Sequence, residues 1–222
     1  MLGAALLLAL PALLPAEEPP QILGVYIERL RAGVEAAYGK NEEDIARTCA
    51  RLKCPHPYLG LESVTGPKEV WWFNAYASEA DKDRVARAWE QNSAATAALR
   101  GLSQRKRPLT GEPKSFFATY RGDPGSASCW RVGGARFFVI ASSKGMRRAG
   151  GCVFDVPDGT RLAITPLATR READLEAAAA GDDARMFAVR PSWSLPAPAW
   201  VKADPDFWRA RGDGLTLPLD FP

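Results

Sequence analysis

The sequence predicts an α+β fold in which one antiparallel sheet carries its helices on a single face. Three observations lead to this prediction. Residues 22–121 alternate in the order strand, helix, strand, strand, helix, strand, with short connections. The aromatic strand 68–77 (KEVWWFNAYA) runs directly into a helix that begins at a capping box, Ser78 with Asp81. Further short strands follow residue 128, which predicts a second, β-rich module.

The first strand and the first helix each show a two-sided pattern. Along residues 22–30, one face of the strand carries Val25, Ile27 and Arg29, and the other carries Tyr26, Glu28 and Leu30. The helix 34–52 has an apolar stripe at three- and four-residue steps, formed by Val34, Ala37, Tyr38, Asn41, Ile45, Cys49 and Leu52. We expect the opposite face to be solvated; it carries Glu35, Lys40, Glu42, Glu43 and Arg47. Pro55 ends the helix.

The next elements complete the first module. The strand 57–64 (PYLGLESV) is joined to the aromatic strand by the turn 65–67. The helix that follows Ser78 is predicted to break near Asn92 and to resume as far as Leu102. Residues 105–107 (RKR) are interpreted as cations that complement the dipole at the end of this helix. The fourth strand is 115–121.

The second module is predicted from a strand at 135–142, a hairpin at 152–167, a short helix and a last strand at 185–191. The helix has its own capping box, Thr169 with Glu172, and ends at Gly181. Both halves enter a capped helix from a strand, so they are either distant copies or share only a common local pattern. The second half lacks a counterpart of the first helix, which would make it a degenerate copy.

The chain is divided as follows: a signal peptide at 1–16, a first module at 17–121, a linker at 122–128, a second module at 129–192 and an aromatic tail at 193–222. Residues 1–16 are apolar, end in Ala16 and precede polar residues, as in a secretory signal. A misassigned start or a membrane-tethered stub is the alternative. We expect the mature protein to be exported, periplasmic or secreted, with no membrane segment, and its tail to dock on the body.

Charge and cysteine content restrict the function further. The net charge is +3 and the basic residues are dispersed, so we do not expect a nucleic-acid partner. Four cysteines fit an oxidising compartment, and we expect the local pairs Cys49–Cys54 and Cys129–Cys152. Four cysteines allow three connectivities, so the other pairings stay open.

Strand alternation predicts a small-molecule site. Three strands each present polar or aromatic residues on one face: Tyr26, Glu28 and Leu30; Tyr58, Gly60 and Glu62; Val70, Trp72, Asn74 and Tyr76. An aromatic surface with a few polar anchors is typical of a ligand site. Glu28 and Glu62 are the candidates for proton transfer, because burial raises a carboxylate pKa. The residues predicted to bind substrate are Tyr26, Tyr58, Trp72, Asn74 and Tyr76. Alternatively, the polar groups face solvent or pair with Arg29 or Lys68.

His56 is the only histidine of the chain and lies between two prolines. It is either a third catalytic candidate at the mouth of this site or a loop residue held for rigidity. A zinc set of Cys49, Cys54 and His56 lacks a fourth ligand, so no metal is expected. No phosphate-binding glycine loop or nucleophile elbow occurs in the sequence, and no cofactor is expected.

In element order, in the aromatic strand EVWWFNAY (69–76) and in the long second helix, residues 22–121 resemble the ferredoxin-like modules of the dimeric α/β-barrel superfamily. This superfamily includes the NIPSNAP proteins and the antibiotic-biosynthesis monooxygenases. The resemblance implies that two such sheets close into a barrel, between the subunits of a homodimer or between tandem modules of a monomer. Ligands would lie between sheet and helices or in the barrel. Haem-degrading relatives carry a histidine on the second helix, which this chain lacks.

These observations lead to two functional hypotheses. The first is an exported α/β-barrel protein that binds a small, partly apolar molecule, with cofactor-free proton-transfer or monooxygenase-type chemistry. The alternative is a non-catalytic binding or structural module, whose sheet face is covered by a partner chain or by its own second half.

Overall fold

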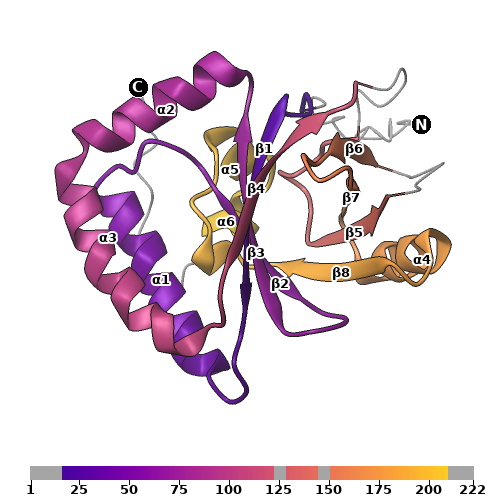
Figure 1. Ribbon diagram of the computed structural model, residues 1–222, viewed down its shortest axis with the longest axis horizontal. Coiled ribbons are helices and arrows are strands. Elements are labelled where there is room, and N and C mark those ends of the chain that lie inside the picture. Colours follow the sequence, from indigo (N-terminus) through magenta and orange to yellow (C-terminus); the bar gives the residue numbers. More distant parts are fainter. Residues whose placement is uncertain (1–16, 123–128, 145–150, 210–222) are drawn as a thin grey trace, which may run out of the picture.

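A closed antiparallel barrel of eight strands forms the centre of the computed structural model, which describes residues 17–122, 129–144 and 151–209 (Figure 1). The strands lie in the order β1-β3-β2-β8-β5-β7-β6-β4. Their bounds are Ile22–Arg29 (β1), Leu59–Ser63 (β2), Glu69–Tyr76 (β3), Lys114–Tyr120 (β4), Phe137–Ser143 (β5), Cys152–Asp155 (β6), Arg161–Leu167 (β7) and Ala184–Val189 (β8).

Helices α1, α2 and α3 lie together beside the strands of the first half, whereas α4 lies next to β8 on the other side of the molecule (Figure 1). The α-helices are Glu35–Arg51 (α1), Glu79–Gln91 (α2), Ser93–Lys106 (α3), Arg170–Ala180 (α4), Pro198–Ala203 (α5) and Pro205–Arg209 (α6). Two 3₁₀ turns are Arg107–Leu109 (η1) and Pro191–Trp193 (η2). The predicted signal peptide, most of the predicted linker and the end of the tail lie outside the described residues. Within the described residues, no helix is long and apolar enough to cross a membrane.

The barrel consists of two four-stranded sheets with the same strand order. The first half is ordered β4-β1-β3-β2, and the second is ordered β8-β5-β7-β6, so β5 to β8 take the places of β1, β2, β3 and β4 in turn. Two antiparallel seams close the barrel, β2 against β8 (Leu61 opposite Val189) and β4 against β6 (Thr119 opposite Asp155). The predicted fold class is therefore confirmed: a ferredoxin-like module and a β-rich second module form one barrel within a single chain.

Within the described residues, the second half has no equivalent of α1. Only eight residues, 144–151, lie between the end of β5 and the start of β6, whereas α1 alone has 17 residues. The prediction of a degenerate second module without the first helix agrees with this spacing.

Apolar side chains from both halves fill the barrel. Its inward-facing residues include Leu23, Val25, Trp71, Phe73, Phe138, Phe154 and Phe187, all of them buried. Ring contacts cross between the halves: Phe73 lies 6.1 Å from Phe138 and Trp71 lies 5.2 Å from Phe187, measured between ring centroids. Because side chains pack the interior, the barrel is a hydrophobic core that holds the two sheets together.

The chain beyond β8 packs against the barrel through three buried tryptophans, Trp193, Trp200 and Trp208. The indole Nε1 of Trp208 donates to the carbonyl of Gly133 at 2.8 Å, and Arg136 forms an ion pair with Asp204. These contacts fix α5 and α6 on the segment that leads into β5.

Both predicted disulfides are present. Cys49 is bonded to Cys54, with Cα atoms 4.8 Å apart, and Cys129 is bonded to Cys152, with Cα atoms 5.3 Å apart. The zinc alternative is therefore wrong, because a disulfide removes the thiolate ligands that it needs.

Candidate functional site

The three residue sets chosen from the sequence do share one face of the sheet. Tyr26 lies opposite Trp72 in the pairing of β1 with β3, and Gly60 lies opposite Trp72 from β2. Glu28 and Glu62 both lie opposite Val70, from either side. This face is the outside of the barrel, where Val70 and Trp72 pack with Tyr38 of α1. The alternation of side chains in β-strands was therefore sufficient to identify the helix-covered surface.

Glu28 lies at the centre of this surface and is 1% exposed. Its Oε2 atom accepts three hydrogen bonds: from the Tyr38 hydroxyl at 2.6 Å, from Trp72 Nε1 at 2.9 Å and from Lys106 Nζ at 3.0 Å. Three donors on one oxygen are the pattern of an ionised carboxylate. The donors come from α1, β3 and α3, so this carboxylate joins the sheet to α1 and α3.

Lys106 reaches a second carboxylate, Glu42 of α1, at 3.2 Å. Three aromatic rings surround its ammonium group, with centroid distances of 5.7 Å to Trp72, 5.9 Å to Tyr26 and 6.0 Å to Tyr38. We call these six residues the acid–base cluster: Tyr26, Glu28, Tyr38, Glu42, Trp72 and Lys106. Its two carboxylates and one ammonium carry one uncompensated negative charge when all three are ionised.

Burial sets the proton affinities in the acid–base cluster. Desolvation raises the pKa of Glu42 to about 7, although Lys106 acts in the opposite direction. Desolvation also acts to lower the pKa of Lys106, but Glu42 and Glu28 outweigh it, so this pKa lies above its usual value. Desolvation followed by the nearby carboxylates raises the pKa of both Tyr38 and Tyr26. Glu42 can therefore exchange a proton near neutral pH.

Two glycines make room for aromatic rings in and beside the acid–base cluster. A Cβ atom on Gly60 would lie 2.8 Å from the Trp72 ring, so the indole lies across β2 only because residue 60 has no side chain. A Cβ atom on Gly39 would lie 3.2 Å from the ring of Trp193, which packs edge-on against Tyr38. The indole of Trp193 therefore covers α1 beside the cluster.

The structure corrects one prediction for a charged residue. Glu42 is expected on the solvated face of the first helix, but it is 1% exposed. Lys106 does lie in the last turn of α3, as interpreted from the sequence, and its ammonium in addition points into the cluster. Each burial depends on the other residue, because the lysine compensates the carboxylates. A signal for Glu42 was present in its spacing from Tyr38, since residues at i and i+4 share a helix face.

Glu62 does not join Glu28. Its carboxylate pairs with Arg190 at 3.2 Å, and the Arg190 guanidinium lies 4.7 Å from the ring of Trp193. Arg29 pairs with Glu69 at 3.0 Å. It is therefore not the partner of Glu28 or Glu62 that the sequence suggested as an alternative. The two predicted catalytic carboxylates therefore share a face but belong to separate ion pairs.

The remaining predicted residues continue this surface toward the end of β3, which pairs with the start of β1. Tyr58 packs edge-on against Trp72, with ring centroids 5.8 Å apart. Asn74 and Tyr76 are partly exposed, and Phe117 of β4 next to them is 49% exposed. Tyr26, also partly exposed, connects this aromatic surface to the acid–base cluster. We call Tyr26, Asn74, Tyr76 and Phe117 the aromatic surface.

His56 is stacked on Tyr76, with the rings 4.6 Å apart and nearly parallel. It is 8% exposed, and its Nε2 atom has no hydrogen-bond partner within the described part of the chain. Desolvation lowers the pKa of His56, against the opposing effect of the Asp81 carboxylate. His56 is therefore a neutral imidazole at pH 7, beside the aromatic surface.

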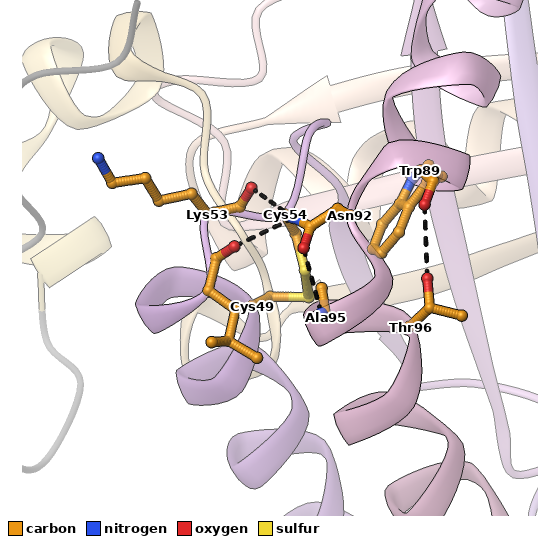
Figure 2. Close-up of a disulfide and its surroundings, with 8 residues drawn as sticks. Cys49, Lys53, Cys54, Trp89, Asn92, Ala95 and Thr96 are labelled. Carbon is orange, nitrogen blue, oxygen red and sulfur yellow. Dashed lines mark hydrogen bonds between the residues drawn. A yellow bond between two sulfur atoms is a disulfide. The ribbon is translucent and has the colours of Figure 1, made fainter.

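The disulfide Cys49–Cys54 ties the loop that leads to His56 back to the end of α1, and it lies beside the break between α2 and α3, as Figure 2 shows. The Asn92 side chain accepts from the backbone N–H of Ala95 and donates to the carbonyls of Leu52 and Lys53. Asn92 thus caps α3 and fastens the break to the disulfide loop. The predicted break near Asn92 is confirmed, and it directs α3 so that Lys106 reaches β1.

Within the described ranges, no group of three or more His, Cys, Asp or Glu side chains is arranged to hold a metal ion.

No protein-family model matches the sequence, and no curated protein matches it. Similar solved structures include three named as putative enzymes: a monooxygenase from Fusobacterium nucleatum, a monooxygenase from Lactobacillus acidophilus and a chlorite dismutase. The first is 8% identical over 80% of this chain and 94% of its own, with a TM-score of 0.48. The second is 6% identical over 78% and 94%, with a TM-score of 0.48. The third is 9% identical over 78% and 96%, with a TM-score of 0.46. At this level of similarity we draw no conclusion about activity from them.

Proposed function

We propose that the protein is an exported α/β-barrel protein that binds a small, partly apolar molecule on the aromatic surface and exchanges a proton with it through the acid–base cluster. One observation carries this proposal. Tyr26 belongs to both sets: it is partly exposed on the same sheet face as Asn74, which pairs with Gly24 two residues along β1, and its ring lies 5.9 Å from Lys106 Nζ. Partly exposed rings next to buried ionisable groups are typical of a small-molecule site.

The cluster supports general acid–base chemistry without a cofactor. A carboxylate with a pKa near the working pH is the most effective proton acceptor, and the pKa of Glu42 is about 7. Lys106 stays protonated and stabilises negative charge, while Glu28 holds Lys106, Tyr38 and Trp72 in place. Removal of a proton from an acidic group of the ligand is the step that this set favours. Cofactor-free oxidation by O₂ would begin from the same deprotonated ligand.

A binding experiment tests the proposed surface. We expect the fluorescence of 1-anilinonaphthalene-8-sulfonate to rise on addition of the folded protein, because its rings match the aromatic surface and its anionic group can pair with Lys82, whose ammonium lies 4.8 Å from the centroid of the Phe117 ring. Phe117→Ser should reduce this signal, whereas Leu175→Ser on α4, which removes a side chain that is 64% exposed, should not. An equal response of the two variants would contradict the proposal.

A non-catalytic binding or structural module is the second candidate. It is favoured by the inner face of the first sheet, which is covered by the second half, and by the ion pairs that engage both Glu28 and Glu62. Under this candidate, Glu42→Gln changes only the free energy of unfolding and leaves proton exchange with any bound molecule unaltered.

Export is the remaining part of the proposal. It is supported by the two disulfides, which persist in oxidising compartments. N-terminal sequencing of protein recovered outside the cytoplasm should start at Glu17.

The oligomeric state belongs to the same proposal. Closure of the barrel within one chain supports a monomer with tandem modules. Light scattering should give the mass of one chain, and the mass of a dimer would contradict the proposed monomer.

A further inference from the structure

The acid–base cluster has a charge imbalance. The side chains of Glu28 and Glu42 are each 2% exposed, and Lys106 bridges them at 3.0 Å and 3.2 Å. Among the described residues, Lys106 is the one cation placed against either carboxylate; the neighbouring Arg105 pairs with Asp44 on the outer side of α1. An unbalanced charge in a buried site is unfavourable, so either a proton or a second cation must compensate it.

The groups that face this charge come from every element packed around it. They are Tyr26 and Glu28 on β1, Trp72 on β3, Tyr38 and Glu42 on α1, and Lys106 on α3. The three rings surround the ammonium group of Lys106, with centroid distances of 5.7–6.0 Å. Aromatic faces and carboxylates are the combination that proteins use to bind ammonium ions.

Asn41 gives a second, independent indication. It is 6% exposed, and neither Oδ1 nor Nδ2 of its amide has a hydrogen-bond partner in the part of the chain that the structure describes. The pairs Arg105–Asp44 and Lys106–Glu42 show that the last turn of α3 packs beside this part of α1. Asn41 and Glu42 follow Tyr38 by three and four residues, and all three are buried, so they belong to the same covered side of α1. A buried amide without partners points to an occupant that supplies them.

We propose that this cluster binds the ammonium group of a small primary amine with an apolar, preferably aromatic, body. The inference rests on the proposed function, whose aromatic surface would hold the apolar body. The ammonium has three donors, and Glu42 and Asn41 Oδ1 can accept from it. It compensates the charge that otherwise requires a proton on Glu42.

Ammonium and proton therefore compete for the same site. Burial raises the pKa of Glu42 to about 7, so an amine that binds below this pH must displace a proton. The apparent affinity should fall by about tenfold for each pH unit below 7, because one proton is released per amine bound. Above pH 7 it should stay constant until the amine loses its own proton.

Calorimetry with benzylamine tests this coupling, and benzyl alcohol is the uncharged control ligand. For the wild-type protein we expect the affinity for benzylamine to be about 100-fold higher at pH 8 than at pH 5, which follows from one proton and a pKa near 7. Titrations in two buffers of different ionisation enthalpy count the protons released. Benzyl alcohol should bind weakly and without dependence on pH.

Three variants test which residues cause the benzylamine affinity and its pH dependence. Glu42→Gln keeps the shape of the side chain and should lose at least tenfold in benzylamine affinity at pH 8, together with its pH dependence. Asn41→Leu should weaken benzylamine severalfold while proton release persists, which guards against a folding defect in the first variant. Glu62→Gln is the matched control, because Glu62 pairs with Arg190 outside the cluster, and should behave as wild type.

The outcomes separate this inference from the proposed function. If benzyl alcohol and the fluorescent probe bind but benzylamine binds no better and releases no proton, the inference is overturned and the proposed function stands. Retention of wild-type affinity by Glu42→Gln likewise overturns it. If none of the three compounds binds, the proposed function fails as well.

Discussion

Replacement of Lys106 by methionine should destabilise the protein strongly and in a pH-dependent way. Methionine matches the length of the stem but leaves Glu28 and Glu42 without their cation. At an effective dielectric constant of about 20, each ion pair at 3.0–3.2 Å has a gross attraction of roughly 5 kcal/mol. Desolvation of the lysine offsets much of this. We therefore expect a net loss of about 3–5 kcal/mol in the free energy of unfolding at pH 8.

The loss should be smaller at pH 5.5. A carboxyl group with a raised pKa binds more protons in the folded state than in the unfolded state. Its burial therefore lowers the free energy of unfolding less and less as the pH falls toward the pKa of the same group in the unfolded chain. In the variant, the pKa of Glu42 rises further because Lys106 no longer opposes its protonation. Over the pH range in which Glu42 is protonated in the variant but ionised in the wild type, the difference in the free energy of unfolding between the two proteins shrinks by about 1.4 kcal/mol per pH unit.

Urea unfolding followed by circular dichroism at the two pH values measures both effects. Arg105→Met is the control, because Arg105 forms only an exposed pair with Asp44 and should cost at most about 1 kcal/mol. The double variant Lys106→Met/Glu42→Gln should recover part of the loss at pH 8. If Lys106→Met costs no more than the control, or the same amount at both pH values, the assignment of a buried charge cluster is refuted.

Three further predictions concern other parts of the molecule. Replacing the pair Cys129–Cys152 by alanines should cost more stability than replacing Cys49–Cys54, roughly 3 against 2 kcal/mol by loop entropy, because the bridged residues are 23 rather than 5 apart; chemical denaturation tests the order. The single histidine should titrate below pH 6.5 by NMR, since desolvation lowers the pKa of His56, and a midpoint at or above 6.5 would disprove its burial. Stability linked to His56 is then lost as the pH falls through this range. Trp208→Ala should lower the free energy of unfolding by about 3–5 kcal/mol, because the indole is fully buried; a cost below 1 kcal/mol in the same assay would show that the tail is not docked.

The sequence allowed the face of the sheet to be predicted, but not the chemistry on it. Alternation of side chains is a local rule, so Tyr26, Trp72 and Gly60 were grouped correctly before any pairing was known. The break at Asn92 and the two disulfides also follow from local signals: a capping residue, and cysteines close to each other along the chain.

The acid–base cluster was missed because it depends on distant residues. Helical periodicity sorts residues by polarity, and by that criterion Glu42 belongs to the solvated face. Its burial requires a cation that comes from another helix, and Lys106 is 78 residues from Glu28. A short sequence motif cannot encode such a contact. The seam of β2 with β8 is of the same kind, since Leu61 and Val189 meet only after the whole chain has folded.

Closure of the barrel within one polypeptide also determines how many sites a molecule can have. In a two-fold symmetric dimer, every substitution appears twice, so both halves must change together. Here each half can diverge alone, and only the first has the helix that supplies Tyr38 and Glu42. The stoichiometry should consequently be one amine per polypeptide, and saturation should follow a simple hyperbola without cooperativity.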